Sequence, residues 1–131
     1  MASQFNPVVR FIDAVNARDL EAVAQALHPE FEMVVPQHPA RGFTGRAQEV
    51  SNMEYLLSRY SDGRIEILDM VDTRSEVWVE TSFLARDVEI AAVVIFEIDA
   101  TTNTIRRGRF YSERVDPDGP DINEWMRGLG S

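Results

Sequence analysis

The sequence predicts an α+β fold in which helices and strands are segregated along the chain. Apolar residues in the first half recur at the three- and four-residue spacing of amphipathic helices. The second half alternates apolar and polar residues, as strands do, and hairpin-length links separate its β-rich stretches. We therefore expect a single domain over residues 1–131, with helices packed on a mainly antiparallel sheet.

Three helices are expected before most of the sheet. They cover residues 7–16, 19–28 and 45–60. Pro7 suits the first turn of a helix, Asp19 suits an N-cap, and Pro29 disfavours helical backbone in the residue before it. The buried stripe of the third helix is expected to be Val50, Met53, Leu57 and Tyr60.

The strands are expected to be one early strand and a four-strand antiparallel meander. The early strand covers residues 31–36, and a loop over residues 36–45 follows it. The meander covers residues 64–71, 76–84, 88–98 and 104–115. A turn over residues 116–120 then leads to a short last helix with Asp121 as its N-cap.

The expected strand over residues 88–98 is apolar on one face, and on its other face only the ends carry charge, at Glu89 and Glu97. A central strand covered on both sides has this pattern. We expect the helices to cover one side of the sheet and a second subunit to cover the other.

The composition argues against several classes of partner and cofactor. A net charge of -9 opposes binding to nucleic acid, and the longest apolar run, residues 90–96, is too short to span a membrane as a helix. The absence of cysteine suits a reducing, cytoplasmic location. His28 and His38 lack the close spacing of metal ligands, so no metal and no cofactor is expected.

Four segments together resemble the nuclear transport factor 2-like superfamily and, within it, SnoaL-like proteins. They are residues 11–23, 27–33, 42–46 and 105–111. The first segment is similar to the family pattern F-x-x-A-x-N-x-x-D-L-x-x-V. The resemblance implies a cone, in which three helices lie across the concave face of a bent, mixed sheet and leave a deep pocket. It also implies a homodimer formed through the outer sheet face.

The resemblance further implies that the acids and bases of well-known relatives are missing here. Steroid isomerases of this fold place an Asp base at the position of Val35 and a second acid at that of Val94. Epoxide hydrolases place an Arg–Asp pair at Thr81 and Phe83, and a last Asp at Phe110. None of these five side chains is a carboxylic acid or a base, which argues against both activities.

The same alignment defines a set of inward-facing residues as the expected ligand-binding lining. They are Met33, Val35, Met53, Leu57, Tyr60, Val79, Thr81, Phe83, Ile90, Ala92, Val94, Phe96, Phe110 and Ser112. This lining suits a small apolar or aromatic ligand, although the same side chains would also fill the cone as a packed core. A shift of one residue in the last strand would turn Tyr111 or Glu113 inward instead.

Three polar residues are the catalytic candidates. His38 lies in the loop expected at the pocket rim, Tyr55 lies beside the apolar stripe of the third helix, and Asp69 interrupts the alternation of its strand. The residues expected on the outer face, for a dimer contact, are Trp78, Glu80, Arg109, Tyr111 and Glu113.

The leading functional hypothesis is a pocket protein for a small apolar molecule. The first alternative is an isomerase, cyclase, dehydratase or hydrolase that acts without a cofactor on a polyketide, steroid or terpenoid-like substrate. The second alternative is a dimeric scaffold without catalysis, since one fold of this kind serves many functions.

Overall fold

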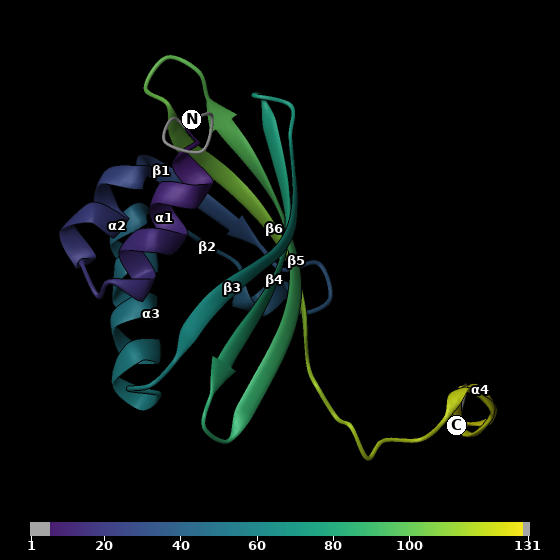
Figure 1. Cartoon of the computed structure of the whole chain (residues 1–131). Helices are drawn as coiled ribbons and strands as arrows, with labels where there is room; N and C mark the ends of the chain where they lie inside the picture. The colour runs from purple at the N-terminus through teal and green to yellow at the C-terminus, as the bar shows by residue number, and fades with distance from the viewer. Residues whose placement is uncertain (1–5, 130–131) are drawn as a thin grey trace.

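The computed structural model describes residues 6–129 and shows three helices on one face of a curved six-stranded sheet (Figure 1). Residues 1–5 and 130–131 of the predicted domain lie outside the described part. The three helices are α1 (Pro7–Asn16), α2 (Leu20–Ala26) and α3 (Arg46–Arg59). The strands are β1 (Leu27–Val34), β2 (Phe43–Thr44), β3 (Arg64–Asp72), β4 (Glu76–Ala85), β5 (Val88–Asp99) and β6 (Thr104–Arg114).

The sheet has the strand order β2-β1-β6-β5-β4-β3. Strands β3 to β6 form the predicted antiparallel meander, whereas β1 pairs in parallel with β6. The predicted α+β class, with a mixed and mainly antiparallel sheet, is therefore confirmed. A short helix, α4 (Ile122–Gly128), follows Asp121 as expected and stands away from the body at the end of an extended segment (Figure 1).

Two predicted boundaries near β1 are wrong. Helix α2 ends at Ala26, and β1 begins at Leu27, because Leu27 pairs with Ile105 of β6 instead of extending the helix. An apolar residue at this position fits the buried stripe of a helix and a buried strand equally well. The element to which Leu27 belongs is therefore decided only by its pairing with β6. The expected loop over residues 36–45 also contains β2, whose two residues pair with β1.

Side-chain amides attach α1 to the edge strand β3 at both of its ends. Asn6 accepts a hydrogen bond from the Val8 amide at 2.8 Å and donates one to Asp72 at 2.9 Å. Asn16 donates to the Ile65 carbonyl at 2.9 Å and accepts from the Ile65 amide at 2.8 Å. These bonds satisfy donors at the helix start and hold α1 over the sheet.

The packed core joins α1 and α2 to the strands. Its most buried large side chains are Phe31, Leu27, Ile105, Val8, Val15, Val23, Val77 and Val79. They come from α1, α2, β1, β4 and β6, so the elements on both sides of the core are fixed by apolar burial.

Candidate functional site

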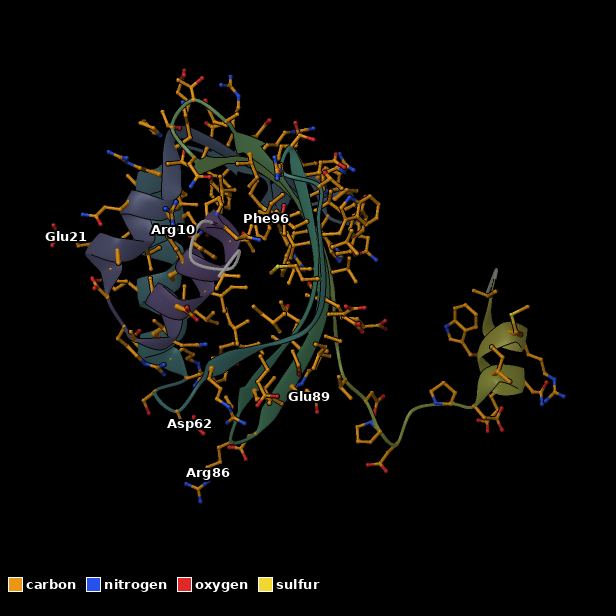
Figure 2. All side chains as sticks on the ribbon, turned by 45° about the horizontal axis from the view of Figure 1, so that its top comes forward. Arg10, Glu21, Asp62, Arg86, Glu89 and Phe96 are labelled. Carbon is orange, nitrogen blue, oxygen red and sulfur yellow. The ribbon has the colours of Figure 1, made fainter. Side chains whose placement is uncertain are left out.

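A cavity of about 700 Å³ lies between α1, α3 and the inner face of the sheet. Figure 2 shows Phe96 on the side of the sheet that faces the helices. The helices contribute Phe11, Ile12, Glu49, Ser51, Asn52, Met53, Tyr55 and Leu56 to the walls. The strands contribute Met33, Ile65, Val79, Thr81, Phe83, Ile90, Ala92, Val94, Phe96, Phe110 and Ser112.

Most of the residues predicted to bind a ligand lie on these walls, but Val35, Leu57 and Tyr60 do not. Val35 and Leu57 are buried in the packed core, and the Tyr60 ring packs edge-on against Phe83 with 5.8 Å between ring centroids. Leu57 lies on the side of α3 that packs into the core, whereas Met53 and Leu56 lie on the side that lines the cavity.

The register of β6 places Phe110 and Ser112 on the inner face. Phe110 pairs with Val94 and Ser112 pairs with Ala92, and all four side chains line the cavity. The residues between them face the opposite way, because side chains alternate along a strand. The alternative register, which would turn Glu113 inward, is not the one observed.

Gly108 of β6 has no side chain, and the side chains of Met33 and Phe96, which line the cavity, pack over it. It pairs with Met33 of β1 on one side and Phe96 of β5 on the other. A Cβ atom at this position would lie 3.1 Å from the Met33 sulfur and 3.2 Å from the Phe96 ring. A larger residue would therefore push these two side chains apart and change the shape of the cavity.

Glu49 is the one carboxyl group on the cavity walls, as far as the described residues extend. Its residue is only 5% exposed, although it carries an ionisable group. Burial raises the pKa of Glu49 from 4.5 to about 7, and a hydrogen bond with the Asn52 side chain opposes part of this effect. A carboxyl group with a pKa near neutrality can donate or accept a proton under physiological conditions.

A short chain of side-chain amides holds the Glu49 carboxyl group. Gln48 donates from Nε2 to the Asn52 side-chain oxygen at 2.8 Å. The Asn52 side chain also lies against the Glu49 carboxyl group, and this contact acts to lower the pKa that burial raises. All three residues lie in the first two turns of α3, which starts at Gly45, where φ is 96° and glycine is favoured.

Glu49 was not among the predicted site residues. A glutamate beside an apolar helical stripe is usually solvated. The stripe through Val50 and Leu57 predicted that the neighbouring face of α3 is the buried one. One signal was available in the sequence. Glu49, Asn52, Met53 and Leu56 recur at helical spacing and form a second face of α3, which is the face that lines the cavity.

The three predicted catalytic residues take different places. Tyr55 lines the cavity but is 70% exposed, so it lies at the mouth. His38 lies in the exposed loop before a short 3-10 turn, and Asp69 lies exposed beside an irregularity in β3. Neither is a wall residue, because loop and edge-strand positions point their polar groups to water.

Two features of residues 6–129 concern metal binding and membrane spanning. Those residues contain no group of three or more metal-ligating side chains. The helices found in the same range are too short or too polar to cross a bilayer.

On the outer face of the sheet, the adjacent strands β4, β5 and β6 each expose one large apolar side chain. They are Trp78 at 45%, Val93 at 40% and Tyr111 at 36% exposure. The predicted outer residues Glu80 and Glu113 are exposed as well. The last of the predicted set, Arg109, lies 4.0 Å from Glu97 in an ion pair.

Comparison with known proteins identifies the family. The SnoaL-like domain model matches residues 8–111, which is most of the chain. The chain belongs to the SnoaL-like domain family. The match ends before α4, so this helix lies outside the matched residues. No curated protein sequence matches the chain.

Several solved structures share the fold. A protein of unknown function with a cystatin-like fold from Methylobium petroleophilum PM1 is 17% identical, with a TM-score of 0.76 over 97% of this chain and 90% of its own. A proposed ketosteroid isomerase from Kribbella flavida DSM 17836 is 18% identical, with a TM-score of 0.73 over 92% and 86%. A proposed SnoaL-like polyketide cyclase from Shewanella denitrificans OS-217 is 11% identical, with a TM-score of 0.72 over 86% and 90%.

Proposed function

We propose that this SnoaL-like protein binds a small, mainly apolar molecule in the cavity between its helices and its sheet. The observation that supports the proposal is a space of about 700 Å³ with mostly apolar walls. Ligand pockets usually have this size and lining, whereas a core packed to normal density leaves only small voids. The few polar wall groups would orient the molecule.

Titration of the purified protein with neutral apolar probes tests this proposal. We expect cyclododecane to bind, as measured by calorimetry, and native mass spectrometry to reveal any molecule that copurifies. The absence of binding by cyclododecane and by a set of terpenoid and aromatic hydrocarbons would reject the proposal.

Acid–base catalysis on the bound molecule is a second candidate function, and Glu49 is the observation that favours it. The positions used by known steroid isomerases and epoxide hydrolases hold Val94 and Phe110 on the cavity wall, so an activity here would use Glu49 instead. A screen of polyketide and terpenoid-like substrates tests this candidate. Activity should be lost in Glu49→Gln and kept in His38→Ala and Asp69→Asn.

We also propose that the protein forms a homodimer through the outer face of its sheet. The exposed Trp78, Val93 and Tyr111 lie on adjacent strands and support this assignment. Aromatic residues with charged neighbours are typical of protein interfaces. The variant that tests the interface is described in the Discussion.

A further inference from the structure

The α3 wall of the cavity presents one carboxyl group to an otherwise apolar space. We propose that Glu49, in its neutral form, donates a hydrogen bond to a carbonyl oxygen of the ligand, so that binding is coupled to protonation of Glu49. This inference rests on the proposed binding function and adds a ligand class to it. The class is neutral, apolar ketones and similar carbonyl compounds.

The polar neighbours that hold Glu49 lie on α3. The Asn52 oxygen accepts from Gln48, and the Asn52 side chain also lies against the Glu49 carboxyl group. A neutral carboxylic acid has one further group to satisfy, the O–H donor. Because Glu49 lines the cavity, this donor is available to a ligand group there.

Among the described residues that line the cavity, none carries a positive charge that would favour the carboxylate. Helix α1 faces the cavity with Phe11 and Ile12, and the wall residues of the strands are apolar or carry hydroxyl groups. Apart from Glu49, Tyr55 is the one titratable side chain among the described wall residues. The raised pKa of Glu49 accordingly comes from burial.

Filling the cavity strengthens the preference for the neutral acid. A neutral ligand displaces water from the walls and brings no counter-charge, so the carboxylate loses hydration without compensation. The O–H donor of the acid would then be buried and needs an acceptor, because an unpaired buried donor is costly. A carbonyl oxygen meets this need without adding charge.

Three probes with the same carbon ring separate the alternatives. Cyclododecane, cyclododecanone and cyclododecylamine are titrated calorimetrically into the wild-type protein at pH 6 and pH 8. We expect the ketone to bind more tightly than the hydrocarbon at pH 6. Both affinities should fall toward pH 8, that of the ketone by about tenfold, because either neutral ligand buries the Glu49 carboxyl group. Ketone affinity that does not change with pH, or preferred binding of the cationic amine, would overturn the inference.

Two substitutions at Glu49 give an independent readout. Glu49→Gln keeps a donor of similar shape but does not titrate, so it should bind the ketone equally at pH 6 and pH 8. Glu49→Leu should keep hydrocarbon binding and lose the preference for the ketone. Glu54→Gln, at an exposed position of the same helix, is the matched control and should keep the wild-type pH dependence.

The outcomes distinguish the two proposals. If cyclododecane does not bind to the wild type, the proposed binding function fails and this inference fails with it. If cyclododecane binds but the ketone shows neither a gain nor a pH dependence, only the inference about Glu49 fails. The wild-type titrations decide this even if Glu49→Leu does not fold.

Discussion

The inner and outer faces of β4, β5 and β6 share one strand register, but their side chains have different surroundings. The inner row across the three strands is Thr81, Ala92 and Ser112. The outer row, one residue away, is Glu80, Val93 and Tyr111. The inner row lines the cavity, whereas the outer row lies on an exposed surface with charged neighbours. Alternation along a strand thus separates the cavity wall from the exposed outer surface by a single residue step.

Carboxyl groups on the two sides of the sheet differ in the same way. Glu49 faces the inner side from α3 and is buried, whereas Glu80 and Glu113 on the outer side are exposed. Exclusion of water destabilises the charged form of Glu49. The surroundings of a glutamate, and not its residue type, therefore decide whether it exchanges protons near neutral pH.

The largest expected effect concerns the pH dependence of stability. Glutamate in the unfolded chain titrates near its ordinary value of 4.5, and folded Glu49 titrates near 7. Between these values the folded state holds a proton that the unfolded state has released, so stability falls as pH rises. The difference corresponds to about 3 kcal/mol, which Glu49→Gln should remove.

Urea unfolding at pH 4.5 and pH 8 measures this effect as a difference between the variant and the wild type. Glu113→Gln, on the outer face, is the matched control and should stay within about 0.5 kcal/mol of the wild type at both pH values. An equal pH dependence in wild type and Glu49→Gln would contradict the distinction between inner and outer carboxyl groups.

The second prediction probes the outer face alone. Tyr111→Arg places a charge in the centre of the proposed interface and should weaken the dimer by about a hundredfold. Size-exclusion chromatography with light scattering over a dilution series measures the dissociation. Tyr55→Arg, at an exposed tyrosine of α3, should leave the oligomeric state unchanged. A dimer that tolerates Tyr111→Arg would place the interface elsewhere.

The third prediction compares two adjacent alanines of β5. Ala92 faces the cavity and Ala91 faces outward, so the same substitution meets different surroundings. Ala92→Trp fills the space above the middle strand and should weaken cyclododecane binding by about tenfold. Ala91→Trp should leave that affinity unchanged. Similar affinities in both variants, measured by calorimetry, would argue that the probe binds outside the cavity.

The smallest expected effect comes from an ion pair on the outer side. Arg107 bonds Glu32 at 3.1 Å and Glu97 at 3.0 Å, and it links β1 to β5 across β6. Because these side chains are partly exposed, Arg107→Ala should cost about 0.5–1 kcal/mol, and less in 1 M salt. Thermal unfolding measures this cost, with Arg86→Ala in the β4–β5 turn as the control. A cost above about 3 kcal/mol would mean that the outer face is structurally as critical as the inner one.

Much of the fold was predictable because it follows from local periodicity. The alternation over residues 88–98 and the hairpin-length links led directly to the meander that is observed. The end of α2 was not predictable, since Leu27 suits either element until β6 is beside it. The orientation of α3 was not predictable for the same reason. Its spacing predicted the apolar stripe through Leu57, but only packing against other elements shows which face lines the cavity.

Apart from β2 and the end of α2, the sequence by itself determined the order of the elements and the turns of the meander, together with the alternation that turns Thr81 inward and Glu80 outward. These depend on neighbours a few residues apart, so short-range spacing is enough to read them. Only the tertiary structure decided that the cone holds a cavity and that Glu49 is buried in its wall. Burial of a charged side chain depends on elements distant in the sequence, here α1 and the sheet, which exclude water from one face of α3.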